Sequence, residues 1–156
     1  MSPAPSWHQI VNATSVAVDN AGVLLTGGTG SGKSDLALRL IDAGASLIAD
    51  DVTELHSLDG RLNARFPLAA PAGLQGRMEV RGLGILPVRV VAGSVPLILV
   101  AELVAPEMIE RMPLPLMAKY GDFDVALVKL APFEASAVAK LRLAVAVAGG
   151  HIMAPL

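Results

Sequence analysis

Alternation of hydrophobic and polar positions near the start of the chain predicts a β-hairpin. Residues 14–19 (TSVAVD) alternate, residues 20–22 (NAG) supply a turn, and residues 23–27 (VLLTG) form a continuous apolar run. Two such segments joined by a short Asn/Gly turn are typical of antiparallel strands. The second strand would lead directly into the glycine-rich stretch that follows it.

A helical pattern comes next and is followed by a short strand pattern. The segment SDLALRLIDAG places Leu36, Leu40 and Ile41 on one helical face, with Gly44 where a helix commonly stops. The apolar run 46–51 (SLIADD) ends in two acidic residues. Strand, loop, helix and strand therefore follow in order, which predicts a βαβ-like unit.

The remainder of the chain favours strands over helices. A hairpin turned at Asp59-Gly60 is predicted within DVTELHSLDGRLNARFPL, and RMEVRGLGILPVRVV carries an alternating strand into a glycine turn. VPLILVAELV and DVALVKLAP are candidates for buried strands, and an Ala-rich helix is predicted over residues 133–148. The fold class is therefore one mixed α/β domain with a high strand content.

Composition supports a single hydrophobic core. The chain has 156 residues, of which 53% are hydrophobic, and this length suits one domain spanning residues 1–156. Residues 1–7, with Pro3 and Pro5, are expected to be a flexible lead-in. The sequence has no cysteine, which excludes disulfides and thiolate chemistry and fits a cytoplasmic location.

Charge and hydropathy argue against two classes of partner. The formal net charge is −2 and aromatic residues make up 3%, so neither a general basic field nor base-stacking platforms favour nucleic acid. The most apolar stretch, residues 83–101, is interrupted by Pro87, Arg89 and Pro96. Because an uncharged run of about 18 apolar residues is needed to span a bilayer, we expect no membrane segment.

The strongest chemical signal is a phosphate-binding loop. The pattern G-x-x-x-x-G-K-[ST] is met at every fixed position by Gly27, Gly28, Thr29, Gly30, Ser31, Gly32, Lys33 and Ser34. Such a loop cradles phosphates with backbone N–H groups at the start of a helix. Lys33 is expected to bridge the β- and γ-phosphates of ATP, and the Ser34 hydroxyl to bind Mg²⁺.

Two consecutive acids follow the next predicted strand. Asp50 and Asp51 fall where a short helical return brings them beside the phosphate-binding loop. Successive side chains on a strand point to opposite faces, so the two acids are expected to have different roles. One could hold the metal through water, and one could remove a proton from an acceptor hydroxyl. A solvated turn is the alternative.

A third candidate pair lies further along the chain. Glu79 and Arg81 are two residues apart in MEVRGLGI and would share one face of a strand. A carboxylate for Mg²⁺ beside a guanidinium for phosphate would suit phosphoryl transfer. The spacing alone does not distinguish this role from a surface ion pair.

These motifs resemble a known family. GGTGSGKSDLALRL, LIADD and EVRGLGI, in this order, are similar to motifs in the catalytic domain of HPr kinase/phosphorylase, which phosphorylates a serine of the phosphocarrier protein HPr. The resemblance spans residues 23–85 and continues more weakly to PEMIERMPLPL. The chain looks like the short, single-domain form found in alphaproteobacteria.

The resemblance implies a fold and a set of roles. The fold would be a P-loop-containing one related to phosphoenolpyruvate carboxykinase, with a strand-rich mixed sheet and flanking helices. Lys33 and the loop glycines would bind ATP, Ser34 and Glu79 would bind Mg²⁺, and Asp51 would deprotonate the acceptor serine of HPr. Arg111, in PEMIERMP, aligns with a catalytic arginine of the family, although an exposed helix charge is the alternative. Family members form homo-oligomers.

Two departures from the family pattern keep other functions open. Asn12 stands where the family has a histidine, and AKYGDFD replaces a later basic loop linked with dephosphorylation, leaving Lys119 as its cation. Kinase activity on HPr is therefore favoured over phosphorylase activity. The alternatives are a small-molecule kinase on the same scaffold and an ATP-binding sensor without transfer activity.

Overall fold

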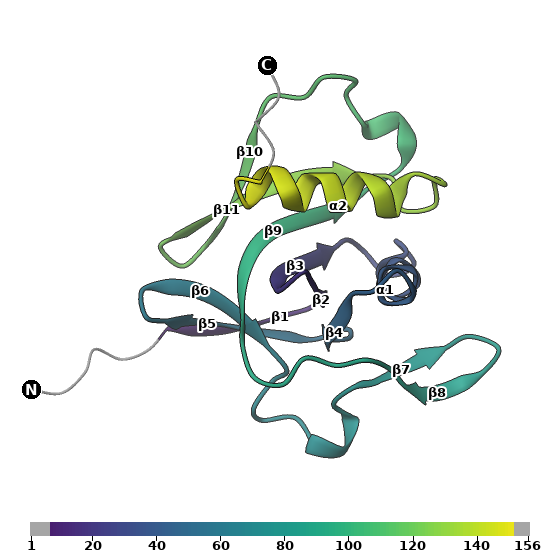
Figure 1. The fold of residues 1–156 in the computed structure, drawn as a ribbon, viewed down its shortest axis with the longest axis vertical. Helices are drawn as coiled ribbons and strands as arrows, with labels where there is room; N and C mark the ends of the chain where they lie inside the picture. Colours follow the sequence, from purple (N-terminus) through teal and green to yellow (C-terminus); the bar gives the residue numbers. More distant parts are fainter. Residues whose placement is uncertain (1–6, 152–156) are drawn as a thin grey trace, which may run out of the picture.

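The computed structural model describes residues 7–151, which form a nine-stranded mixed sheet, a separate two-stranded hairpin and two α-helices (Figure 1). The strands of the sheet are β1 (His8–Val11), β2 (Thr14–Val18), β3 (Ala21–Thr26), β4 (Ser46–Ala49), β5 (Thr53–Leu58), β6 (Arg61–Arg65), β9 (Val95–Leu103), β10 (Leu116–Tyr120) and β11 (Phe123–Leu130). The other elements are the hairpin β7 (Arg77–Val80) and β8 (Gly84–Pro87), the helices α1 (Lys33–Asp42) and α2 (Ala137–Ala148), and the 3-10 turns η1 (Ala72–Leu74) and η2 (Pro106–Met108).

The strand β9 connects the two halves of the sheet. The order is β1-β5-β6-β9-β3-β2-β4, and β10 and β11 attach through β9 as well. The first residues of β9, Val95 and Pro96, pair antiparallel with β6, and the rest of the strand runs parallel to both β3 and β11. β9 curves strongly between these partners (Figure 1). The sheet therefore curls, with β1, β5 and β6 folded over one face.

Two hydrophobic clusters lie on opposite faces of the central strands. Val16 and Leu99 belong to the cluster that packs under α1 and α2, whereas Ala17 and Val100 belong to the cluster under β5 and β6. Because successive side chains on a strand point to opposite faces, a strand covered on both sides is apolar at every position. This double burial explains the continuous apolar runs in β3 and β9.

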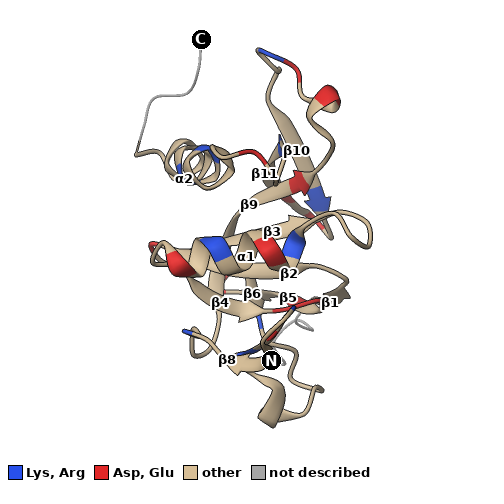
Figure 2. Cartoon of the chain, turned by 90° about the vertical axis from the view of Figure 1, so that its right-hand side faces the viewer, with Lys and Arg blue, Asp and Glu red and all other residues tan. Residues whose placement is uncertain are grey.

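The helix α1 forms as its sequence pattern predicts. Leu36, Leu40 and Ile41 are buried against the sheet, and Gly44, with φ +114°, follows the end of the helix. Figure 2 shows charged residues of both signs along the outer side of α1. The helix is therefore amphipathic. Its packing against the sheet fixes the orientation of its N-terminus, which begins at Lys33.

Three expectations for secondary structure need correction. The first hairpin turns at Asp19 and Asn20, which have φ of +49° and +66°, so its turn lies one to two residues before the predicted NAG. The last helix begins at Ala137 because residues 133–136 form turns, in which the Glu134 N–H donates to the carbonyl oxygen of Ala131, just after β11. The strands β1 and β10 were not predicted, since both are exposed edge strands without a strong apolar pattern.

The predicted βαβ-like unit is confirmed with one change. β4 runs parallel to β3, as predicted, but β2 lies between them and pairs antiparallel with both. The hairpins turned at Asp59-Gly60 and in the EVRGLGI segment are also present. Within residues 7–151, neither helix is long and apolar enough to cross a membrane.

Candidate active site

The phosphate-binding loop joins β3 to α1, and three of its glycines, Gly27 and Gly32 among them, have backbone angles that other residues rarely adopt. Gly27 has φ +148° and Gly32, the residue before α1, has φ +99°. A Cβ on Gly27 would lie 2.6 Å from Ser31 Oγ, and one on Gly32 would lie 2.9 Å from the Phe133 ring. The loop therefore needs glycine at these positions both for conformation and for space.

Lys33 lies over the loop that precedes it. Its Nζ donates hydrogen bonds to the carbonyl oxygens of Gly27 (2.8 Å) and Gly28 (3.0 Å). The positive end of α1 and the ammonium thus lie on the same side of the loop. Among the buried side-chain nitrogen and oxygen atoms of residues 7–151, Ser31 Oγ is the one with no hydrogen-bond partner. This arrangement provides the cation and the helix N-terminus that phosphate binding requires.

Asp50 connects the loop to β4. Its Oδ1 accepts hydrogen bonds from Ser34 Oγ (2.8 Å) and from Thr14 Oγ1 (3.0 Å). The Thr14 hydroxyl also accepts a hydrogen bond from the backbone N–H of Asp51 (3.2 Å). Thr14 is fully buried at the start of β2. One hydroxyl therefore holds both consecutive aspartates.

The two aspartates have different environments, and the different roles expected for them stay a prediction. Asp50 is half-buried and bonded, whereas Asp51 is exposed and has a left-handed backbone conformation with φ +65°. Partial burial raises the pKa of the Asp51 carboxyl, the negative charges of Asp50 and Glu79 add to this, and the charge of Lys33 opposes it. A raised pKa makes this carboxylate a stronger base than an ordinary aspartate, which favours its accepting a proton.

Glu79 is brought to the aspartates, but its predicted relation to Arg81 is wrong. β7 ends at Val80, and Arg81 begins the turn that leads to Gly82, with φ +90°. Glu79 and Arg81 therefore do not share a strand face, because the chain has left the extended conformation. Glu79 lines one cavity with Asp50 and Asp51, whereas Arg81 is exposed in the turn.

Arg111 is not brought to the other candidate residues within this chain. It is exposed in the segment between η2 and β10. This segment and the β7–β8 hairpin lie on opposite sides of α1 in both views (Figures 1 and 2). Its catalytic role stays a prediction. Asn12 is exposed in the turn between β1 and β2, and Lys119 lies on β10 opposite Asp124.

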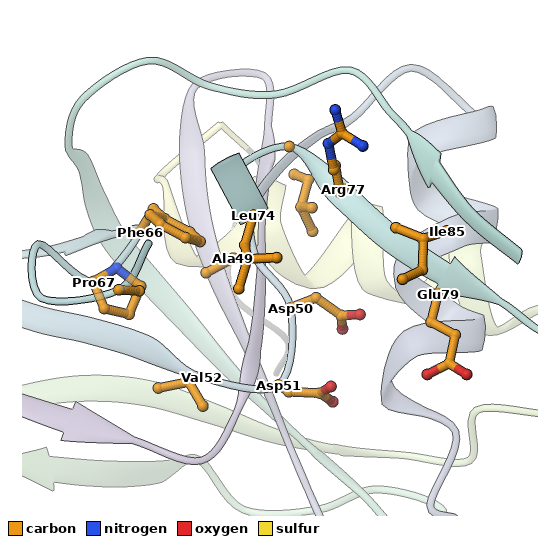
Figure 3. Close-up of a pocket in the computed structure, with 13 residues that line it drawn as sticks. Ala49, Asp50, Asp51, Val52, Phe66, Pro67, Leu74, Arg77, Glu79 and Ile85 are labelled. Atoms are coloured by element: carbon orange, nitrogen blue, oxygen red, sulfur yellow. The ribbon is translucent and has the colours of Figure 1, made fainter. Parts of the chain in front are cut away.

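A cavity of about 350 Å³ adjoins the aspartates. It lies between the end of β4, residues 66–76 and the β7–β8 hairpin (Figure 3). Asp50, Asp51 and Glu79 gather on one side, and Phe66 and Pro67 lie on the opposite side. Arg77 lines the cavity as well, so the cavity combines three carboxylates, one guanidinium and an apolar side.

The residues present are suitable for Mg²⁺ and a nucleotide. Mg²⁺ prefers oxygen ligands and is commonly held by one or two carboxylates together with substrate phosphates. Ser34 Oγ and Asp50 Oδ1 lie 2.8 Å apart, and Glu79 reaches the same cavity as Asp50. Within residues 7–151, His, Cys, Asp and Glu form no group of three or more placed to hold a metal on their own. The metal would therefore depend on phosphate oxygens as well, and the ligand roles stay predictions.

Thr14 is the site residue that the sequence analysis missed. A threonine at the start of an alternating strand carries no signal of its own, because Thr is common in strands. Its role depends on the pairing of β2 with β4, which brings Ser15 opposite Ala49 and so places Thr14 beside the Asp50–Asp51 turn. Only the strand order reveals this contact.

The sequence of the chain is similar to those of known proteins. The family HPr Serine kinase C-terminal domain matches residues 6–103. The chain is 40% identical over 99 residues to the HPr kinase/phosphorylase of Nitrosomonas europaea, covering 60% of this chain and 27% of that protein. It is 39% identical over 93 residues to the HPr kinase/phosphorylase of Clostridium beijerinckii, covering 60% and 28%. The chain thus aligns with less than a third of the length of these relatives.

A solved structure shares the fold over nearly the whole chain. The Hpr(Ser) kinase/phosphatase from Coxiella burnetii superposes with a TM-score of 0.72 and 28% sequence identity. The match covers 92% of this chain and 90% of that one. Similarity of structure therefore extends beyond residue 103, where the family match in sequence ends.

Proposed function

The chain belongs to the HPr Serine kinase C-terminal domain family, and on that premise we propose that it transfers the γ-phosphoryl group of ATP to a serine of the phosphocarrier protein HPr. The predicted strand-rich mixed sheet with flanking helices is the fold of this family. One observation carries the proposal most directly: Asp51, whose carboxyl has a raised pKa, adjoins an aspartate that is hydrogen-bonded to Ser34 of the phosphate-binding loop.

The donor side of the reaction is assigned to the loop and the first turn of α1. Backbone N–H groups of residues 27–32 and the Lys33 ammonium would bind the β- and γ-phosphates. Ser34, Asp50 and Glu79 would hold Mg²⁺, which supplies charge neutralisation at the phosphates when bound. Lys33 lies within 3.0 Å of two loop carbonyl oxygens, so a short movement of its side chain would bring the ammonium to a phosphate oxygen.

The acceptor side is assigned to Asp51. The serine oxygen forms a bond to the γ-phosphorus as the bond between that phosphorus and the ADP oxygen breaks, and the serine proton passes to the Asp51 carboxylate. In phosphorolysis the same carboxyl would return the proton to the serine oxygen while inorganic phosphate attacks phosphoserine. The left-handed backbone of Asp51, fixed by Thr14, supports this role because it holds the carboxylate at the edge of the site.

Intact-mass spectrometry of an HPr protein incubated with the chain and Mg-ATP tests this proposal. We expect a gain of one phosphoryl group that Lys33→Ala and Asp51→Asn both abolish. An unmodified acceptor together with retained ATP binding would contradict it and favour an ATP-binding sensor. ATP turnover stimulated by a metabolite, and not by HPr, would favour a small-molecule kinase.

We also infer that the chain forms a homo-oligomer and acts in the cytoplasm, where ATP is available. Support for self-association comes from the segment that joins β9 to β10 and from β10 itself. Large apolar side chains are exposed there by 42% to 81%, namely Met108, Met112, Leu114, Leu116 and Met117. Contiguous apolar residues exposed in this way are typical of protein interfaces.

A further inference from the structure

The cavity beside Asp51 has two chemically distinct sides. The carboxylates of Asp50, Asp51 and Glu79 gather on one side, toward the phosphate-binding loop and α1 (Figure 3). The opposite wall comes from Phe66 and Pro67 and from residues of η1 and the segment before it. Its volume of about 350 Å³ is at the lower end of the range for ligand sites. It therefore suits one large side chain better than a whole cofactor.

The position of the cavity separates it from the donor nucleotide. Among the residues that line it, none belongs to the phosphate-binding loop, residues 27–34, whereas both aspartates do line it. A nucleotide bound through its phosphates at the loop would be tied to that loop. A group that fills the cavity, in contrast, must touch Asp51. The cavity therefore lies on the acceptor side of the proposed reaction.

The chemistry of the walls restricts the occupant. A charged group placed against Phe66, Pro67 and Leu74 would lose its hydration without gaining a partner from these side chains. An anionic group would in addition face the carboxylates of Asp50, Asp51 and Glu79, and a cationic group would face Arg77, which lines the same cavity. The occupant that meets both conditions is an uncharged, apolar side chain.

We propose that the cavity binds an apolar side chain of the phosphoacceptor protein, close in sequence to the serine that is phosphorylated. Asp51 is the link, since it both lines the cavity and accepts the serine proton in the function proposed above, on which this inference rests. An extended chain advances roughly 3.3–3.6 Å per residue, so the apolar residue lies within about two positions of the serine. The cavity thus selects the acceptor protein by the apolar residue that lies near the phosphorylated serine.

Two adjacent alanines give a matched pair of variants. Ala70 lines the cavity and is half-buried, whereas Ala69 is exposed beside it and does not line the cavity. We expect Ala70→Phe to fill the space and raise the KM for the acceptor about tenfold or more, which is the scale of losing one apolar contact in a specificity pocket. The Kd for ATP and the effect of Ala69→Phe should stay at wild-type values.

Variants of the acceptor complete the test. Replacing the apolar residue within two positions of the serine by alanine should raise KM for the wild-type chain but cause no further rise with Ala70→Phe, because the two changes remove the same contact. Circular dichroism and the ATP Kd report whether Ala70→Phe is folded. If it is not, Leu74→Trp narrows the cavity from a residue that is 57% exposed.

The possible results distinguish a failure of this inference from a failure of the proposed kinase function. Phosphoryl transfer by the wild type with an unchanged acceptor KM in both cavity variants would overturn the inference alone. A rise in the ATP Kd in place of the acceptor KM would assign the cavity to the nucleotide and also overturn it. No transfer by the wild-type chain would contradict the proposed function, and the acceptor site with it.

Discussion

At the scale of single residues, Thr14 determines how two adjacent acids differ. Its hydroxyl donates to Asp50 and accepts from the backbone of Asp51, and Thr14 itself is fully buried. Asp50 is thereby oriented toward Ser34, and Asp51 keeps an exposed carboxylate on a left-handed backbone. A residue outside the recognisable motifs thus sets the geometry of two residues within them.

Replacing Thr14 by valine removes this hydroxyl at nearly constant volume. The Asp51 N–H would lose a part-buried acceptor and Asp50 would lose one donor, so we expect the free energy of unfolding to fall by about 1–3 kcal/mol, with slower phosphoryl transfer. Urea unfolding and initial rates measure the two effects. Thr14→Ser retains the hydroxyl and should keep most of the rate; equal losses in both variants would show that the methyl group, and not the hydrogen bonds, matters.

Asp51 should make stability depend on pH. Because its pKa in the folded chain is above the ordinary value of 3.8, the folded state keeps its proton to higher pH than the unfolded state does. The free energy of unfolding therefore falls as pH rises through the range above 3.8, and it stays lower at neutral pH.

The variant Asp51→Asn isolates this contribution. It removes the charge, and asparagine tolerates the left-handed backbone. We expect it to unfold at higher urea concentration than the wild type at neutral pH, with the difference vanishing below pH 3.8. Asp59→Asn, the same change at another left-handed turn residue with φ +51°, measures the background. A pH-independent difference would contradict the assignment.

At the scale of elements, the contact between β3 and β9 tolerates little change. Gly22 in β3 lies so close to β9 that a Cβ on it would be 2.7 Å from the backbone oxygen of Pro96. β9 pairs with β6 on its other edge at this point, so the backbone has neighbours on both sides. The strand that leads into the phosphate-binding loop is therefore held by backbone contact as well as by apolar packing.

The variant Gly22→Ala tests this contact. Adding a methyl group would force β3 and β9 apart, and we expect a loss of about 1–3 kcal/mol in the free energy of unfolding. In Gly73→Ala, within η1, the new methyl group would have no neighbour within 4 Å. Urea unfolding of the two variants should separate them, and similar stabilities would show that β3 and β9 can relax.

Prediction from the sequence succeeded for elements with strong local signals. The α1 helix, the Asp59-Gly60 turn and the β7–β8 turn depend on periodicity and glycine placement, which are visible in a short window. The placement of Asp50 beside Ser34 also followed from the strand, loop, helix order. Thr14, the edge strands and the end of β7 before Arg81 depend on partners distant in the chain, which local patterns do not contain.

At the scale of the whole molecule, the surface around residues 108–117 should control association. Met112 and Leu114 are 77% and 81% exposed, and we expect Met112→Glu with Leu114→Glu to convert the oligomer to a species with the mass of one chain. Sedimentation velocity measures this change. Leu68→Glu, at a residue 72% exposed in another part of the fold, should leave the oligomer intact. A wild-type chain that sediments as a monomer would contradict the inference.

The curved strand β9 has a consequence for the order in which the protein is made. The phosphate-binding loop is synthesised by residue 34, but β3, which positions it, lacks its parallel partner until residues 95–103 have left the ribosome. Until then β3 has an open edge. The strands β5 and β6 also lack β9, the strand that connects them to the rest of the sheet. A nascent chain therefore carries the complete nucleotide-binding motif long before the strand that leads into that motif has its parallel partner.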